Sequence, residues 1–190
     1  MSNLEDYIYL DRGCLSKDFC DELLDELKTN ESWETHQYFN EYSKQVVVNE
    51  NEPLVCGLQT NNGKLLQDKL WFVIQDYLNQ EVIKNSIHPF NCWNGYETPR
   101  FNCYSEKTEM RYHVDHIQTM FSGSKRGIPT LSIVGLLNDD FQGGEFEFFG
   151  NKKMDLSAGS VMVFPSVFLY PHAVYPVRSG KRYSFVSWVW

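Results

Sequence analysis

The sequence predicts a mainly β fold with helices confined to its N-terminal part, and three observations support this prediction. From about residue 82 onward, short apolar or alternating segments are separated by Gly, Pro, Asn and Asp, a pattern typical of consecutive strands. About seven or eight such strands in the C-terminal part favour a double-sheet jelly roll or a barrel. Before them, two segments carry apolar residues at helical spacing. Hydrophobic residues make up 42% and aromatic residues 15% of the 190 residues, which is typical of a packed, β-rich interior.

The N-terminal elements are expected to be a strand, a helix, further strands and a second helix. Residues 4–11 are typical of a short strand. Ser16 is a suitable N-cap for a helix that ends near Thr29. One or two strands are predicted within residues 33–48, and a second amphipathic helix from about Gly63 to Leu78. Both helices are predicted to pack against the outside of a sheet.

The C-terminal part is expected to supply the strands of the core. Alternation over residues 100–104 places Arg100, Asn102 and Tyr104 on one face, and the apolar run 131–137 predicts a strand buried on both faces. Further strands are predicted at 145–149, 161–164, 174–177 and 182–190, with turns at 138–144 and 178–181. No repeat or linker interrupts the sequence. Residues 1–190 are therefore predicted to form one domain, with helical support over about 14–80 and a β core over about 85–190.

The charge balance restricts the kind of partner. The sequence has 17 Lys and Arg against 25 Asp and Glu, a formal net charge of −8. An acidic surface repels phosphate backbones, so a nucleic-acid substrate is disfavoured and a basic peptide or protein partner is favoured. The charge does not predict the oligomeric state.

The cysteine pattern bears on the compartment. The number of cysteines is odd and no pair has CxxC spacing; they are Cys14, Cys20, Cys56, Cys92 and Cys103. The sequence has neither a recognisable leader nor an apolar run of about 18 residues that could span a bilayer. These features predict reduced thiols, no membrane span and a cytoplasmic location.

A candidate metal site centres on His113 and Asp115. In an extended strand these two side chains point to the same face, because successive residues alternate. His172, far along the chain, is a candidate third ligand. Two histidines and one carboxylate on one face, with three coordination positions left open, are typical of non-heme Fe(II) oxygenases. The site would need no acid–base residue beyond the metal ligands.

The other histidines are weaker candidates. His116 is a rival ligand, but on a strand it faces away from His113. On a helix His113 and His116 would share a face, which the surrounding β pattern disfavours. His36 and His88 have no partner pattern and are predicted to be incidental.

Arg182 is a candidate anion-binding residue. It opens a strand in which Arg182, Ser184, Val186 and Trp188 share one face. A guanidinium inside a small barrel is costly unless a carboxylate meets it, and no acidic residue lies nearby in this segment. A dicarboxylate cosubstrate is one suitable partner, because the planar fork of arginine binds a carboxylate through two parallel bonds. A structural Asp or Glu from elsewhere in the chain is the alternative.

Taken together, these motifs resemble the Fe(II)- and 2-oxoglutarate-dependent dioxygenases, and within them the prolyl 4-hydroxylase-like branch. The resemblance covers roughly residues 85–190. It rests on the ordered set Arg100–Tyr104, Met110–Asp115, Leu131-Ser132, Leu137–Asp139, Gly143–Glu145, Phe164–Ser166, His172 and Ser179–Ser184. The resemblance implies a double-stranded β-helix (jelly-roll) core with N-terminal helices packed on one sheet. It also implies that His113, Asp115 and His172 bind Fe(II).

The resemblance assigns further residues and cofactors. It implies that Arg182 binds the distal carboxylate of 2-oxoglutarate with help from Tyr104 and Ser184, that O2 is consumed, and that ascorbate can serve as reductant. Trp188 matches an aromatic residue beside the iron, and Arg100 and Trp188 are candidate substrate contacts. Arg182 replaces the lysine of many animal and plant prolyl 4-hydroxylases and keeps its charge. The implied reaction is hydroxylation of a peptidyl residue, in the first place proline, by procollagen-proline-type dioxygenase chemistry.

Two other interpretations remain open at this point. The same chemistry could act on a lysyl or asparaginyl side chain, a free amino acid or a nucleobase. A non-catalytic jelly-roll binding module, with the three ligands structural or holding a non-redox metal, is the alternative from another class. Three segments are expected to bind the substrate, at 34–45, 90–99 and 117–129. Their sequences do not identify it. Gly123 and Gly127 suggest that the last of these could close over the site.

Overall fold

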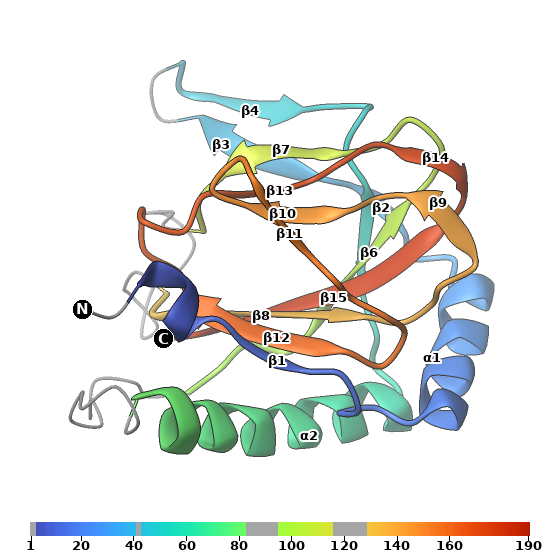
Figure 1. The fold of residues 1–190 in the computed structure, drawn as a ribbon. Helices are drawn as coiled ribbons and strands as arrows, with labels where there is room; N and C mark the ends of the chain where they lie inside the picture. Colours follow the sequence, from blue (N-terminus) through green and yellow to red (C-terminus); the bar gives the residue numbers. More distant parts are fainter. Residues whose placement is uncertain (1–2, 41–42, 83–94, 116–128) are drawn as a thin grey trace.

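The structure is a computed structural model that describes residues 3–40, 43–82, 95–115 and 129–190. Figure 1 shows two β-sheets that face each other, with the two long helices on the outer side of the larger sheet. All strand pairs of these two sheets are antiparallel. The predicted mainly β jelly roll with N-terminal helices packed on one sheet is confirmed.

The larger sheet combines strands from both ends of the chain. In spatial order its strands are β1 (Tyr9–Asp11), β12 (Val161–Pro165), β8 (Leu131–Leu136), β15 (Arg182–Val189), β6 (Arg100–Tyr104), β5 (Leu54–Gly57) and β2 (Glu34–Thr35). The long strand β15 lies at its centre, paired with β8 on one side and β6 on the other. Residues on β6, β8 and β15 therefore share one buried surface.

The smaller sheet and two ribbons complete the β structure. The smaller sheet has the order β11 (Lys152–Met154), β10 (Phe146–Phe148), β13 (His172–Val174) and β7 (Met110–His113). The ribbons pair β14 (Val177–Gly180) with β9 (Phe141–Gly143), and β3 (Gln37–Asn40) with β4 (Gln45–Val48). Strands β7 and β13 are neighbours, so two distant parts of the chain meet there.

The helices begin at side-chain caps that the sequence provides. Helix α1 spans Lys17–Thr29, and the Ser16 hydroxyl accepts a hydrogen bond from the Phe19 amide at 3.3 Å. Helix α2 spans Asn61–Tyr77 and is capped by Thr60, so it begins two residues before the predicted start. A short 3-10 helix, η1 (Leu4–Tyr7), precedes β1, and a π-helical turn, η2 (Leu78–Val82), follows α2.

Two hydrophobic layers follow from the alternation along β15. Tyr183, Phe185 and Val189 point to one side and pack with buried residues of α1 and α2. Val186 and Trp188 point to the other side and pack between the sheets with aromatic residues of β10 and β12. Arg182 and Ser184 lie on this second side as well, so β15 directs its charged group toward the smaller sheet.

Several local predictions were wrong in their details. Residues 4–7 form a 3-10 helix rather than a strand, because the side chain of Asp6 accepts the Asn3 amide at 2.7 Å and closes a turn. The predicted turn 178–181 is largely strand β14, and part of the predicted turn 138–144 is its partner β9. Strands β5 and β11 were not predicted. Such short strands depend on distant partners more than on their own residues.

The structure describes four of the five cysteines, and all four have free thiols; Cys92 lies outside the described residues. Burial raises the pKa of the Cys14 thiol to about 12, and of the Cys20 and Cys56 thiols to about 11. These thiols are therefore protonated and unreactive near neutral pH. In the described part of the chain, neither long helix combines the length and apolar character that crossing a bilayer would need.

Candidate metal site

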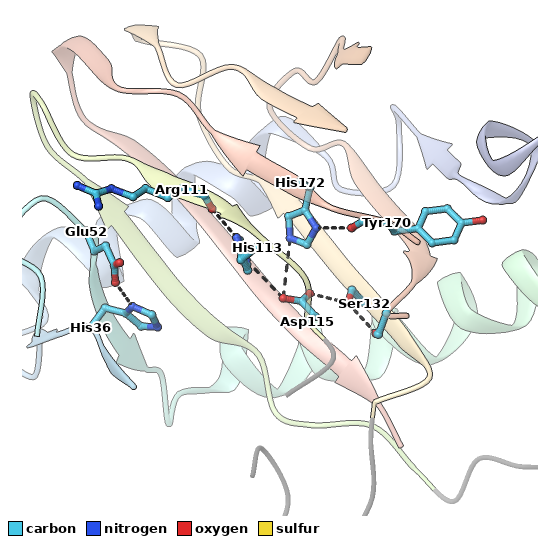
Figure 2. A network of polar contacts seen from close by, with 9 residues as sticks. His36, Glu52, Arg111, His113, Asp115, Ser132, Tyr170 and His172 are labelled. Carbon is cyan, nitrogen blue, oxygen red and sulfur yellow. Dashed lines mark hydrogen bonds and ion pairs between the residues drawn. The ribbon is translucent and has the colours of Figure 1, made fainter. Parts of the chain in front are cut away.

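His113, Asp115 and His172 converge between the two sheets. His113 ends β7 and His172 begins β13, where the two residues are direct partners in the ladder. The Nε2 atoms of His113 and His172 lie 3.5 and 3.8 Å from the same Asp115 oxygen, Oδ1. One potential ligand atom from each residue lies within 4.8 Å of the others, and Figure 2 shows the three side chains directed at one another. This geometry suits a single metal ion.

Sequence analysis placed His113 and Asp115 on one face of a single strand, and this part of the prediction was wrong. The strand stops at His113, and Asp115 lies beyond it in a bend rather than on the same strand face. The bend turns the Asp115 carboxylate toward the two imidazoles. His116, the rival ligand, lies outside the described residues, as do His88 and the glycines of the segment 117–128.

Backbone carbonyls fix the orientation of both imidazoles. Nδ1 of His113 lies 2.7 Å from the Arg111 carbonyl oxygen, and Nδ1 of His172 lies 3.1 Å from the Tyr170 carbonyl oxygen. A carbonyl can only accept, so each Nδ1 carries the proton and donates it. Each Nε2 is then directed at Asp115, and in the neutral imidazole it carries the lone pair that metal ligation requires.

Two serines orient the carboxylate. The Ser132 hydroxyl donates to Asp115 Oδ2 at 2.6 Å, and the Ser166 hydroxyl lies 2.8 Å from that of Ser132. Oδ2 is thus engaged by the protein, which leaves Oδ1 facing the imidazoles (Figure 2). Sequence analysis did not assign a role to either serine. The available signal was Ser132 itself, the single polar residue in the apolar run 131–137.

The three groups have different pKa directions. Burial opposes ionisation of Asp115, but the hydrogen bond from His113, the charges of both histidines and the Ser132 bond hold its pKa well below the usual range. Burial lowers the pKa of His172 to about 4, against the raising effect of Asp115. For His113 burial also disfavours the cation, yet the hydrogen bond and charge of Asp115 raise its pKa. His172 is therefore neutral at pH 7, as a ligand must be.

Aromatic side chains explain the burial of His172. Phe146 stacks on its ring at a centroid distance of 5.2 Å, and Phe164 meets it edge-on at 5.1 Å. His172 is consequently only 4% exposed. This apolar wall excludes water from one side of the site and raises the strength of electrostatic interactions within it.

Arg182 lies on the facing sheet and has no acidic partner among the described residues. It is 1% exposed, donates to the Ser184 hydroxyl at 2.8 Å and stacks over the Tyr104 ring at 5.1 Å. Its Nε has no hydrogen-bond partner. Burial lowers the pKa of Arg182, which remains charged at any ordinary pH. Sequence analysis grouped Arg182, Tyr104 and Ser184, and the structure places these three residues together.

The close fit around Arg182 explains why a glycine, Gly144, directly follows β9. Gly144 has φ +65, and a Cβ there would lie 2.8 Å from Cδ of Arg182. Only glycine accommodates both the backbone conformation and the arginine stem. Gly144 thus keeps the space for the buried guanidinium.

Arg100 and Trp188 lie further along the same sheet face. The Arg100 guanidinium stacks over the Trp188 ring at 5.0 Å, and its Nε has no hydrogen-bond partner. Burial lowers the pKa of Arg100, while the nearby charges of Tyr104 and Asp115 raise it. Both sequence-predicted substrate candidates therefore lie together and within electrostatic range of the triad.

His36 was predicted to be incidental, but it lies in close polar contact with a buried carboxylate. Its Nδ1 lies 2.5 Å from Oε2 of Glu52, a carboxylate that is only 8% exposed (Figure 2). Asn49 donates to the other oxygen of Glu52 at 3.3 Å. Burial lowers the pKa of His36 despite this contact, and the charges of Arg100 and His113 act in the same direction. No local sequence signal marks this pair, because its two members lie in separate segments.

Comparisons with known proteins agree with this arrangement. A model of the 2OG-Fe(II) oxygenase superfamily matches residues 99–190. This range contains the triad and, on the facing sheet, Arg100 and Arg182. This match, over slightly less than half of the chain, identifies residues 99–190 as similar to that superfamily. The superfamily implies Fe(II) and 2-oxoglutarate as cofactors, with O2, and the expected likeness to the prolyl 4-hydroxylase-like branch is confirmed.

The curated relatives are PKHD-type hydroxylases of bacteria. PiuC of Pseudomonas aeruginosa is 31% identical over 132 residues, which are 66% of this chain and 53% of that protein. A relative from Pseudomonas fluorescens is 33% identical over 96 residues, 47% of this chain and 42% of its own length. The chain thus spans about half the length of the curated relatives it matches.

Solved structures of prolyl hydroxylases share the fold. The viral collagen prolyl hydroxylase of Paramecium Bursaria Chlorella virus-1 has a TM-score of 0.68 at 17% identity, covering 96% of this chain and 94% of that one. A prolyl hydroxylase of Trichoplax adhaerens, in complex with a hypoxia inducible factor peptide fragment, has a TM-score of 0.70 at 15% identity, covering 97% and 84%.

Proposed function

We propose that this protein is an Fe(II)- and 2-oxoglutarate-dependent oxygenase that hydroxylates a prolyl residue in a peptide or protein. The observation that carries the proposal is the pairing of two features across the interior. A His-Asp-His triad lies on the smaller-sheet side, and a buried arginine without an acidic partner among the described residues lies on the larger sheet.

The residues present fit the two cofactors. The donor set of two imidazole nitrogens and one carboxylate oxygen matches the ligands of non-heme Fe(II) and leaves three positions free. Arg182 offers a charged fork to a distal carboxylate, and the adjacent Tyr104 and Ser184 offer hydroxyl groups. When bound, Fe(II) with 2-oxoglutarate supplies the O2 activation that places an oxygen atom on an unactivated carbon.

The roles of the protein's own residues follow from this arrangement. His113, Asp115 and His172 would hold the metal, and Ser132 would keep the carboxylate oriented. Arg182 would fix the cosubstrate by its distal end, with Tyr104 and Ser184 beside it. The aromatic wall on His172 would keep water from the reaction. No residue is needed as a general base.

Support for a prolyl substrate comes from the relatives rather than from the site. Similar proteins include PKHD-type hydroxylases and prolyl hydroxylases, one of the latter in complex with a peptide fragment. We also propose that residues 1–190 act as one domain, because the helices and the larger sheet share one hydrophobic core.

Turnover assays test the proposal directly. The purified protein would be incubated in air with Fe(II), 2-oxoglutarate, ascorbate and proline-containing peptides. We expect succinate release coupled to a peptide product one oxygen atom heavier at proline. Anaerobic addition of Fe(II) and 2-oxoglutarate should give a visible metal-to-ligand absorption band. No band, together with no 2-oxoglutarate turnover with or without peptide, would contradict the proposal and favour a passive binding module.

A further inference from the structure

A row of polar atoms without partners lines the inner face of the larger sheet. In the described residues, four buried side-chain nitrogen or oxygen atoms on β6 and β15 have no hydrogen-bond partner. These four are Nε of Arg182, Oδ1 of Asn102, Nε of Arg100 and Nε1 of Trp188. Buried polar atoms are rarely left without a hydrogen-bond partner. Several such atoms in one place therefore indicate a ligand that forms hydrogen bonds with them.

The guanidinium groups of Arg182 and Arg100 lie at opposite ends of this row, and one small cosubstrate cannot contact both. Tyr104 pairs with Arg182 across the ladder, whereas Arg100 pairs with Val186. The two positions are four residues apart on each strand, which is roughly 13 Å along the sheet. Arg182 leans over Tyr104, and Arg100 leans over Trp188, which is further from Arg182 along β15. A five-carbon dicarboxylate held by Arg182 is too short to reach the Arg100 guanidinium.

Among the described residues, no carboxylate forms an ion pair with Arg100. The buried carboxylates of the described residues are Glu52, Asp115 and Glu147. Glu52 is engaged by His36 and Asn49, and Glu147 accepts hydrogen bonds from Tyr112 and Tyr175. Asp115 acts on Arg100 only through its charge, because its oxygens face two imidazoles and Ser132. A metal ion at the triad would further cancel that charge.

We propose that Arg100, stacked on Trp188, binds a carboxylate group of the substrate, so that this enzyme acts on an anionic substrate. The inference rests on the oxygenase activity of the proposed function, whether the prolyl group is free or within a peptide, and deepens it by naming the charge of the substrate. A partly buried guanidinium whose buried Nε has no partner binds a carboxylate well, and the indole beneath it fixes its plane. The carboxylate can be the α-carboxylate of a free amino acid or the side chain of an acidic residue beside the target. This replaces the expectation of a basic partner, which rested on the net charge of the whole surface.

Calorimetric binding to protein loaded with Mn(II) and 2-oxoglutarate tests the proposal without turnover. One arm compares free L-proline with L-prolinamide, which lacks the α-carboxylate. The other compares capped tetrapeptides that differ only in containing Asp-Pro, Asn-Pro or Lys-Pro. We expect the carboxylate-bearing member of at least one arm to bind roughly tenfold to hundredfold tighter than its neutral counterpart. Which arm responds identifies the source of the carboxylate.

Variants of Arg100 assign the preference to this residue. Arg100→Gln should abolish the preference for the anion, and Arg100→Lys should retain part of it. Because removal of an unpaired buried charge relieves a desolvation cost, Arg100→Gln should leave the Tm unchanged or raise it. A purely structural arginine would give a lower Tm instead. Arg12→Gln, at an exposed arginine paired with Asp155, is the matched control and should change neither quantity.

The outcomes separate this inference from the function on which it rests. Failure to bind Mn(II) and 2-oxoglutarate would overturn the proposed function itself. Normal loading with no carboxylate preference in either arm, including no binding of any compound, would overturn the inference alone. Loss of 2-oxoglutarate binding in Arg100→Gln with a lowered Tm would also overturn it, because Arg100 would then belong to the scaffold or the cosubstrate site.

Discussion

The two sides of the interior handle their polar groups in opposite ways. On the smaller-sheet side, protein groups hold the outer atoms of the triad: both imidazoles donate to backbone carbonyls, and Asp115 accepts from Ser132 while facing both rings. On the larger-sheet side, four buried polar atoms of β6 and β15 have no partner. The first arrangement is preorganised by the fold, whereas the second is completed only by molecules that bind.

This difference has an energetic consequence. Buried groups that are mutually partnered contribute to stability, and removing one of them leaves the others uncompensated. Buried charges without partners cost stability, and removing them can be neutral or favourable. Substitutions on the two sides should therefore change stability in opposite directions, although both sides are expected to be needed for activity.

The largest effect is expected for Asp115→Ala. This substitution removes one ligand, which is also the group that both imidazoles face and the acceptor of the Ser132 hydroxyl. We expect loss of turnover, a drop of more than about a hundredfold in Fe(II) affinity, and a lower Tm. Anaerobic metal titration, succinate assays and thermal unfolding measure the three quantities.

Two variants bracket that result. Ser132→Ala should weaken Fe(II) binding by roughly tenfold to a hundredfold, because the carboxylate loses only its orienting bond. Asp155→Ala, at an exposed aspartate paired with Arg12 at 3.5 Å, should change nothing measurable. Full Fe(II) affinity in Asp115→Ala would show that the triad does not bind the metal.

The next largest effect is expected for Arg182→Gln on the facing sheet. The affinity for 2-oxoglutarate should fall roughly a hundredfold or more, because a buried charge-assisted contact is lost. Fe(II) affinity in the absence of 2-oxoglutarate should not change, and the Tm should not fall. The readouts are the KM for 2-oxoglutarate, metal titration and thermal unfolding. A Tm loss as large as that of Asp115→Ala would contradict the contrast between the two sides.

A third prediction concerns the opposite face of the larger sheet, where packing rather than ligand binding determines the effect of a substitution on stability. Gly135 lies on β8, and a Cβ there would lie 2.1 Å from the Phe185 ring. Gly135→Ala should therefore cost about 1–3 kcal/mol of unfolding free energy and lower the Tm by roughly 2–12 °C. Gly57→Ala on β5 is the control, since nothing lies within 4 Å of a Cβ there. Equal Tm values for the two variants would contradict this packing.

The smallest effect is a pH dependence of the metal-free protein. The pKa of His172 is about 4 in the folded state against 6.5 for an ordinary histidine, so the unfolded chain binds more protons between these values. Stability should therefore fall as the pH decreases from about 6.5 to about 4, by on the order of 1–2 kcal/mol between pH 7 and pH 5 from this residue.

The other triad members act in different pH windows. The raised pKa of His113 contributes stability below 6.5 that is lost as the pH rises through its folded value, and the lowered pKa of Asp115 contributes stability that is lost on strong acidification. Urea unfolding in EDTA at pH 5 and pH 7 isolates the His172 effect, because His172→Gln should show a smaller pH dependence than the wild type. An unchanged dependence would mean that His172 is not held neutral by burial.

The sequence by itself determined the elements whose signals are local. Helix α1 and the strands β6, β8, β12 and β15 lie close to their predicted bounds, because capping residues and apolar periodicity within each segment specify them. The ordered motifs also carry the resemblance to the 2OG-Fe(II) oxygenases and, with it, the candidate residues His113, Asp115, His172 and Arg182. Each of these groups has a chemistry that is visible without coordinates.

Only the tertiary structure decided which polar groups have partners. Ser132 meets Asp115 across 17 residues of chain, and His36 meets Glu52 across 16. Arg100 meets no carboxylate among the described residues, although the chain contains 25 acidic residues. The short strands β9 and β14 likewise exist because they pair with each other. The physical reason is common to all of these cases: periodicity is a property of neighbouring residues, whereas burial and pairing depend on segments that meet only when the chain folds.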